Sequence, residues 1–132
     1  MIRCVPLCAL LAVLSNQAGA QALELPSGTQ AVLHEVLLDT VGSDTWVRFR
    51  LVAPMIDAAQ EVAPSHDILE QDFPFLCADL ALPYLRQHAL QADRIAISLS
   101  DRIVEFGTTD TAATQYFEVF RREGANCIWE GF

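Results

Sequence analysis

Residues 30–53 read QAVLHEVLLDTVGSDTWVRFRLVA, two apolar runs on either side of a Gly-Ser pair. The runs at 30–39 and 45–53 are rich in Val, Leu, Trp and Phe, which favour β-strands. Gly42-Ser43 predicts a two-residue type II′ turn, because glycine adopts the positive φ of the first turn position without strain. This stretch therefore predicts a β-hairpin with a defined register.

The position of the turn assigns the hairpin residues to two faces. We expect one face to join the core, and its cross-strand pairs are His34 with Leu51, Val36 with Phe49 and Leu38 with Val47. The opposite face combines opposite charges with leucine and tryptophan, in the residues Glu35, Leu37, Trp46, Arg48 and Arg50. The cross-strand pair of Glu35 with Arg50 supports this register, because opposite charges stabilise such a pair.

Beyond the hairpin, the sequence predicts one main helix. Apolar residues recur at helical spacing over residues 68–80, and Pro83 follows them. Pro74 lies inside this run and leaves two alternatives open. Either the helix begins after an N-cap at Ser65 and kinks at Pro74, or it begins at an N-cap at Asp72 with Pro74 in its first turn. In both cases we expect Pro83 to end the helix.

Further segments alternate apolar and polar residues as strands do. Residues 93–100 (DRIAISLS) direct three aliphatic side chains to one face, and these are Ile95, Ile97 and Leu99. We expect residues 103–106 to form another short strand or to continue the preceding one beyond a bulge. Residues 115–121 and 126–132 form a second predicted hairpin about Glu123-Gly124, in which one face carries Tyr116, Phe120, Cys127 and Trp129.

Cys77 and Cys127 are the two cysteines outside an N-terminal apolar segment. In an exported protein, such a pair without further ligands at metal spacing predicts a disulfide, with a zinc site or a catalytic thiol as alternatives. The disulfide requires the helix to lie over the hairpin face that carries Cys127. The predicted fold is therefore α+β: an antiparallel sheet of five to six strands, with one main helix packed on it and one disulfide.

The first 20 residues have the features of a secretory signal peptide. Arg3 supplies a positive charge, residues 4–14 are largely apolar, and Ala18-Gly19-Ala20 is a small-x-small cleavage motif. The apolar run is too short to span a bilayer, which needs roughly 20 residues, and an N-terminal core helix is the alternative. We expect cleavage near Ala20, a periplasmic or secreted location, and a single domain over residues 21–132.

The composition excludes some classes of protein. The 132 residues include 8 Lys and Arg against 17 Asp and Glu, which gives a formal net charge of −9. Such an acidic chain repels phosphate, so we expect no nucleic-acid partner. The chain is too short for a large cofactor enzyme, and we expect no cofactor. A hydrophobic content of 52% is enough to build a core and argues against disorder.

Several blocks of the chain together resemble a known family. They are 25–28 (LPSG), 33–36 (LHEV), 46–54 (WVRFRLVAP), 97–102 (ISLSDR), 104–107 (VEFG), 113–118 (ATQYFE) and 127–132 (CIWEGF). In these blocks the chain is similar to a family of small exported proteins of unknown function from Rhodobacter-like alphaproteobacteria. The resemblance implies a periplasmic or secreted protein of a Gram-negative cell, and it brings no activity, cofactor or catalytic residue.

Three groups of residues are candidates for chemistry. His34 could act as a base or a ligand, and we favour instead a core histidine bonded to the backbone. Segment 98–102 could supply part of a catalytic triad through Ser98 or Ser100, but without a G-x-S-x-G motif a turn at Asp101-Arg102 is the simpler interpretation. Acidic residues on the predicted helix are expected to form a solvated face instead of a Ca²⁺ site, and they are Asp67, Glu70, Asp72 and Asp79.

Trp46, Arg48 and Arg50 are the strongest candidates for a binding surface, because tryptophan and arginine are common anchors of protein interfaces. They form such a surface if no helix covers their strand face; under a helix they become core residues with snorkelling Arg stems. We therefore predict a non-enzymatic module that binds a periplasmic or envelope protein. The alternatives are a small hydrolase or metal-dependent enzyme that uses His34, and an inhibitor of a periplasmic or foreign enzyme.

Overall fold

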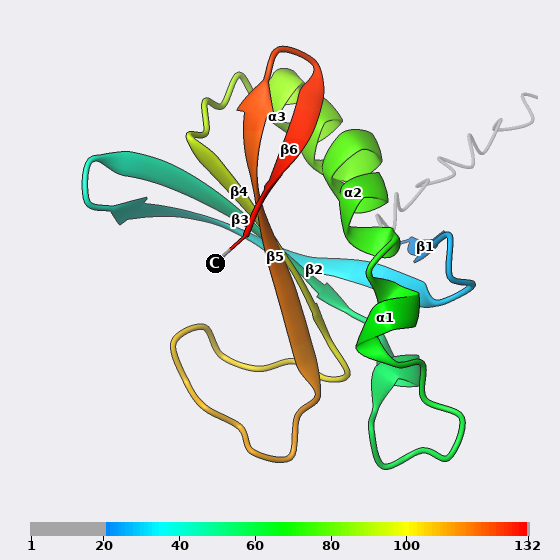
Figure 1. Cartoon of the computed structure of the whole chain (residues 1–132). Coiled ribbons are helices and arrows are strands. Elements are labelled where there is room, and N and C mark those ends of the chain that lie inside the picture. The colour runs from blue at the N-terminus through cyan, green and yellow to red at the C-terminus, as the bar shows by residue number, and fades with distance from the viewer. Residues whose placement is uncertain (1–20, 132) are drawn as a thin grey trace, which may run out of the picture.

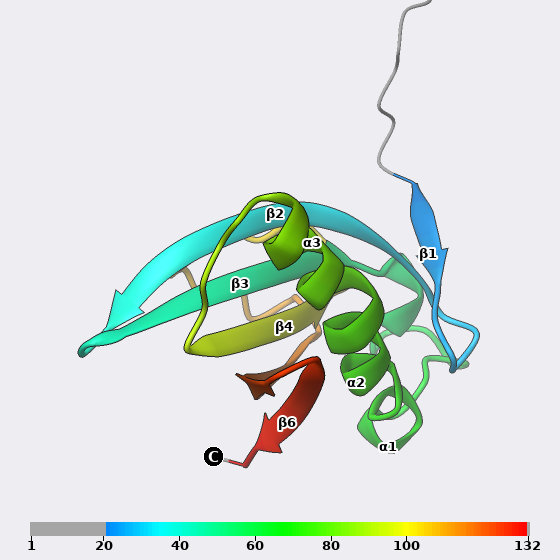
Figure 2. The ribbon, with the colours of Figure 1, turned by 90° about the horizontal axis from the view of Figure 1, so that it is seen from above.

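Six strands form one curled sheet, and a helix lies against one of its faces (Figures 1 and 2). The computed structural model describes residues 21–131, so the signal peptide predicted over residues 1–20 lies outside the described residues. Along the sheet the strands keep their order in the chain: β1 (Ala22–Glu24), β2 (Gln30–Val41), β3 (Asp44–Val52), β4 (Arg94–Ser100), β5 (Gln115–Glu123) and β6 (Asn126–Glu130).

The hairpin of β2 and β3 has the predicted register over most of its length. Val41 pairs with Asp44 at the turn, where Gly42 has a φ of 62°, and the pairing continues in step to Glu35 and Arg50. The inward side chains of β3 are buried as predicted, and they are Val47, Phe49 and Leu51. Turn chemistry and strand alternation therefore determine this register.

A β-bulge at His34 ends the predicted register. Leu33 pairs with Leu51, so His34 is the extra residue of the bulge, and its side chain is exposed. The prediction that His34 faces Leu51 in the core is wrong, because one inserted residue shifts the alternation beyond it. Leu38 is exposed as well, since the hairpin tip extends beyond the helix (Figure 2).

β3 and β4 are parallel, whereas the other neighbouring pairs among the described strands are antiparallel. The predicted α+β fold, with its sheet, main helix and disulfide, is confirmed, and this parallel pair is a difference within it. The physical reason is the long connection between the two strands. It contains the helix, which returns the chain to the starting end of β3 before β4 begins.

The main helix runs over residues 66–87 in consecutive segments: α1 (His66–Leu69), α2 (Asp72–Leu76), the π-helical turn η2 (Cys77–Ala81) and α3 (Leu82–Gln87). A short 3-10 turn, η1 (Pro54–Ile56), precedes it. The carbonyl of Ser65 accepts hydrogen bonds from the N–H groups of Ile68 and Leu69, so Ser65 precedes the helix as predicted. Pro74 lies in the first turn of α2, where its missing N–H costs no helix hydrogen bond.

The helix does not end at Pro83, contrary to the prediction. Pro83 is the second residue of α3, and only Leu82 separates it from the π-helical turn η2. A π turn interrupts the usual i→i−4 pattern of hydrogen bonds. The missing N–H of Pro83 therefore falls where this pattern is already broken, and the helix continues to Gln87.

The core lies between the helix and the sheet. The aliphatic side chains of β4 point inward as predicted, and they are buried in one cluster with Phe73, Leu76, Leu85 and Phe120. The predicted disulfide between Cys77 of η2 and Cys127 of β6 is confirmed, with a Cα–Cα distance of 6.2 Å. It links the middle of the helix to the far side of the sheet from β1.

Residues 101–114 form an irregular loop between β4 and β5, so the predicted strand at 103–106 is absent. β4 already has β3 on one side and β5 on the other, and a further strand would find no free edge there. The loop instead contacts the sheet face opposite the helix through side chains, among them that of Phe106.

One acidic residue of the helix is not solvated, contrary to the prediction. Asp72 is fully buried and accepts hydrogen bonds from the backbone N–H of Ser27 at 2.9 Å and from the Ser27 hydroxyl at 2.5 Å. The turn after β1 is thereby tied to the start of α2. The remaining three residues of this group are exposed as predicted, and they are Asp67, Glu70 and Asp79.

Candidate functional site

The sheet face opposite the helix carries the predicted binding residues. Trp46, Arg48 and Arg50 alternate along β3 with the buried core residues, so their side chains point to the other face. Among the described residues, the helix packs against the other face of the sheet, and loop 101–114 covers part of this one. We use the name open-face site for the surface formed by Trp46, Arg48, Arg50, Phe106 and Phe117.

Arg48 is held between a carboxylate and two aromatic rings. Its Nε and Nη2 atoms donate to Oδ2 of Asp39 at 3.3 and 3.1 Å. Its guanidinium carbon lies 5.0 Å from the ring centroid of Trp46 and 5.2 Å from that of Phe106. At these distances the cation is attracted to both rings, so the three side chains stabilise one another in a single stack.

Arg50 connects the sheet to loop 101–114. Its Nη1 atom donates to Glu35 at 2.8 Å, and its Nη2 atom donates to the carbonyl of Val104 at 2.6 Å. Its guanidinium carbon also lies 5.6 Å from the ring centroid of Phe106. The side chain is only 13% exposed, so Arg50 positions the loop more than it offers a free contact.

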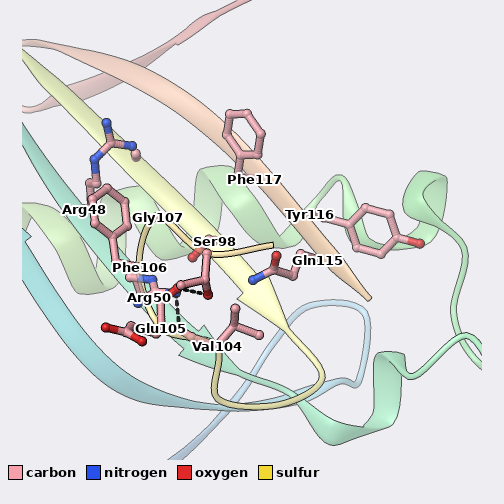
Figure 3. Close-up of a pocket in the computed structure, with 12 residues that line it drawn as sticks. Arg48, Arg50, Ser98, Val104, Glu105, Phe106, Gly107, Gln115, Tyr116 and Phe117 are labelled. Carbon is pink, nitrogen blue, oxygen red and sulfur yellow. Dashed lines mark hydrogen bonds between the residues drawn. The ribbon is translucent and has the colours of Figure 1, made fainter. Parts of the chain in front are cut away.

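A pocket of about 200 Å³ lies beside these residues (Figure 3). Arg48 and Arg50 form one side, the loop residues from Val104 to Thr108 another, and Ser98, Gln115 and Phe117 the floor and far side. Phe117 is 67% exposed, and Phe106 is also exposed. The pocket therefore combines exposed aromatic surface with hydrogen-bonding side chains.

The charges around this pocket are largely compensated. Arg48 is paired with Asp39 and Arg50 with Glu35, and Glu105 adds a further carboxylate to the lining. An anionic ligand would therefore compete with carboxylates that already occupy the guanidinium groups. The arrangement favours contact with apolar and aromatic groups over binding of an anion.

Sequence reasoning missed two residues of this site. Phe106 was assigned to the strand predicted at 103–106, and only the loop conformation brings its ring over Arg48 and Arg50. Phe117 could have been found from the sequence. The alternation of QYFEVFR places Phe117 on the face opposite Tyr116, so its aromatic ring points away from the predicted core.

Asp101 and Arg102 form the turn pair that the sequence predicts. Arg102 donates to Oδ2 of Asp101 from Nε at 3.0 Å and from Nη2 at 2.7 Å. The Arg102 hydrogen bond holds the pKa of the Asp101 carboxyl below its ordinary value, against the opposing effect of burial. Ser100 Oγ accepts a 3.5 Å hydrogen bond from the backbone N–H of Arg102. This cluster supports the base of the loop.

His34 does not meet an acidic partner in the structure: within residues 21–131 its side chain forms no hydrogen bond or ion pair. Across the same residues, no group of three or more His, Cys, Asp or Glu side chains is placed to hold a metal ion. The two sulfurs of Cys77 and Cys127 are joined to each other, which excludes the alternatives of a zinc site or a catalytic thiol at these positions.

Among the described helices, none has the length and apolar character needed to cross a membrane. Comparison with curated proteins and with solved structures finds no match. A family model described as a family of unknown function (DUF6497) matches residues 8–132, which is nearly the whole chain. The chain therefore belongs to the family of unknown function DUF6497.

Proposed function

We propose that this protein is exported and binds a periplasmic or envelope protein through the open-face site. One observation carries the proposal: the face left free by the helix combines a Trp46–Arg48–Phe106 stack with the exposed ring of Phe117 beside a pocket. Aromatic and arginine side chains are common interface anchors. Side chains already held in place lose less entropy when a partner binds.

Export is supported by two features of the chain. The N-terminal segment has a positive residue, an apolar run and a small-x-small motif, as a cleavable signal peptide does. The Cys77–Cys127 disulfide supports the same conclusion, because disulfides persist in oxidising compartments such as the periplasm. In a Gram-negative cell the protein would then meet its partner in the envelope.

The charge balance of the site defines what the partner presents. Since Arg48 and Arg50 are compensated by Asp39 and Glu35, the free surface is mainly aromatic. We expect the partner to place an apolar or aromatic side chain against Phe117 and into the pocket. Burial of an aromatic ring at such a contact contributes on the order of 1.5–3 kcal/mol.

The test uses the disulfide-bonded protein as bait in periplasmic extract. Phe117→Asp puts a charge in the centre of the proposed contact, whereas Val62→Asp puts the same charge on an exposed loop residue elsewhere. We expect a partner captured by the wild-type protein and by Val62→Asp to be lost with Phe117→Asp. A partner that Phe117→Asp still captures would overturn the assignment of this face.

Export has its own test. Intact mass and N-terminal sequencing of the protein from the periplasmic fraction are expected to show a chain that begins near Gln21. Material that begins at Met1 would contradict the proposed cleavage, independently of which surface binds a partner.

A further inference from the structure

A second pocket, of about 120 Å³, lies on the helix side of the sheet, between the chain around the start of α2 and the strands β5 and β6. We call it the helix–β6 pocket. Its lining combines aromatic rings, a proline and two carboxylates, and consists of Glu70, Phe73, Pro74, Glu118, Phe120 and Trp129. Phe73 and Phe120 are buried parts of the core, whereas the Trp129 side chain is exposed at the rim.

Glu118 lacks the Arg partner that three other half-buried carboxylates have. Glu35, Asp39 and Glu130 are 25 to 37% exposed, and each is paired with an Arg side chain. Glu118 is more buried, at 17% exposed, and has no Arg partner within residues 21–131. A carboxylate at this depth loses solvation that a nearby cation would restore.

The present neighbours of Glu118 leave room for a cation. The indole N–H of Trp129 donates to Oε2 at 2.7 Å, and Nε2 of His66 lies 3.5 Å from Oε1. A carboxylate offers about four acceptor positions, so positions remain free on both oxygens. Glu70 lines the same pocket, is exposed, and has no ion-pair partner among the described residues.

Trp129 is positioned at the rim by two contacts. One is its hydrogen bond to Glu118. The other is with Gly131, where an added Cβ atom would lie 2.9 Å from Cη2 of the Trp129 ring. The missing side chain at Gly131 therefore lets the end of the chain approach the indole. Tryptophan is the aromatic side chain that attracts cations most strongly.

We propose that the helix–β6 pocket binds the guanidinium or ammonium group of an Arg or Lys side chain from a partner protein. The carboxylates of Glu118 and Glu70 supply the charge, and the Trp129 ring and Pro74 contact the aliphatic stem. The pocket volume of about 120 Å³ fits a single side chain, because pockets that bind whole small-molecule ligands are larger, typically about 300–1,000 Å³. This pocket lies on the opposite side of the sheet from the open-face site, so the inference stands independently of the function proposed above.

The experiment follows the indole N–H resonance of Trp129 in the ¹⁵N-labelled, disulfide-bonded protein, with Trp129→Phe for its assignment. The probes are capped peptides of the form Gly-Gly-X-Gly-Gly in which X is Arg, Lys or norleucine. We expect the Arg and Lys peptides to shift the resonance saturably, with a dissociation constant on the order of 1 mM. Norleucine has the apolar stem without the charge, and equal binding of this peptide would overturn the cation assignment.

Two matched variants distinguish binding by the pocket from nonspecific attraction of the cation to the acidic chain. Glu118→Gln is expected to weaken the Arg peptide at least about tenfold, the equivalent of one lost charge-assisted hydrogen bond. Glu123→Gln removes a charge from an exposed position of the same strand and is expected to change affinity less than about twofold. Equal losses in both variants would show a net-charge effect and overturn the site.

Two further arms complete the test. If Glu118→Gln fails to fold, Glu70→Gln takes its place and is expected to weaken the Arg peptide, because Glu70 is exposed and lines the same pocket. n-Butylguanidine presents the same cation without a peptide. If the Arg peptide binds more tightly than n-butylguanidine, the pocket binds the side chain of a partner protein. If free n-butylguanidine binds more tightly, the natural ligand is a small organic cation, and the proposal of a protein side chain is wrong.

Discussion

Asp101 and Thr114 close loop 101–114 through two hydrogen bonds that run in opposite directions. The Asp101 carboxylate accepts from the Thr114 N–H at 2.8 Å, and the Asp101 N–H donates to the Thr114 carbonyl at 3.0 Å. With the Asp101 side chain only 2% exposed, these bonds are shielded from water. The loop that borders the open-face site is therefore anchored at its two ends by one residue pair.

Asp101→Asn is predicted to lower the free energy of unfolding by about 1–3 kcal/mol near neutral pH, because it removes the charge from hydrogen bonds made in a buried site. The pKa of Asp101 is held below its ordinary value of 3.8, chiefly by Arg102. The carboxylate therefore stabilises the fold above pH 3.8, and this stabilisation is lost as the pH falls from 3.8 through the lower pKa of the folded state.

Urea unfolding of the wild type and of Asp101→Asn, near pH 7 and near pH 3, checks this prediction. The difference between the two proteins should shrink at the lower pH. Glu61→Gln changes an exposed loop carboxylate and serves as the control, with no expected difference at either pH. A deficit of equal size at both pH values would contradict the role assigned to the ionised Asp101.

Asp72→Ala is predicted to destabilise the protein by about 1–3 kcal/mol, since it leaves the backbone N–H and the hydroxyl of Ser27 without their acceptor. The effect should concentrate at the turn after β1. Hydrogen exchange is therefore expected to accelerate at Ser27 and in its neighbourhood more than in β4. Asp79→Ala changes an exposed residue of the same helix and should stay within about 0.5 kcal/mol of the wild type.

Reduction of the Cys77–Cys127 disulfide is predicted to lower the free energy of unfolding by up to about 4 kcal/mol. The two residues are 50 positions apart, and the loop-closure entropy lost from the unfolded chain grows with this separation. Urea unfolding with and without dithiothreitol measures the effect. The double variant Cys77→Ala/Cys127→Ala should not respond to the reductant, and a wild-type midpoint that reductant leaves unchanged would refute the prediction.

His34→Ala is predicted to change stability by less than about 0.5 kcal/mol, because His34 is the exposed extra residue of the bulge. Leu51→Ala, at a buried position of β3, should cost about 2–5 kcal/mol. Thermal or urea unfolding of His34→Ala distinguishes the observed register from the uninterrupted one, and Leu51→Ala gives the size of the loss at a buried position of this hairpin. A large loss in His34→Ala would place His34 back in the core.

Local chemistry made much of the fold predictable. The Gly42-Ser43 turn determines which residues of β2 and β3 face each other, and strict alternation in β4 identifies its inward side chains. The pair of cysteines required the helix to lie over the hairpin that carries Cys127. The turn and the alternation lie within a few residues of the features that they predict, whereas the cysteine pair predicts a contact across 50 positions from residue type alone.

The remaining features have no signal in the local alternation or in the turn residues. The bulge at His34 could not be predicted, because the alternation of residues in β2 is equally compatible with a regular strand. Pro83 stays inside the helix only because a π turn precedes it. Phe106 joins the candidate site because loop 101–114 folds back over two Arg side chains of β3.

The Cys77–Cys127 bond also makes a closed covalent ring of the segment between the two sulfurs, and this ring contains β4, loop 101–114 and β5. A protease cut within that loop opens the ring but releases no fragment, since both new ends stay attached through the sulfurs. Nicked protein should therefore migrate as one intact species on a non-reducing gel and separate into two pieces only after reduction. A cut in this loop therefore leaves the sheet and the helix in one covalently linked molecule.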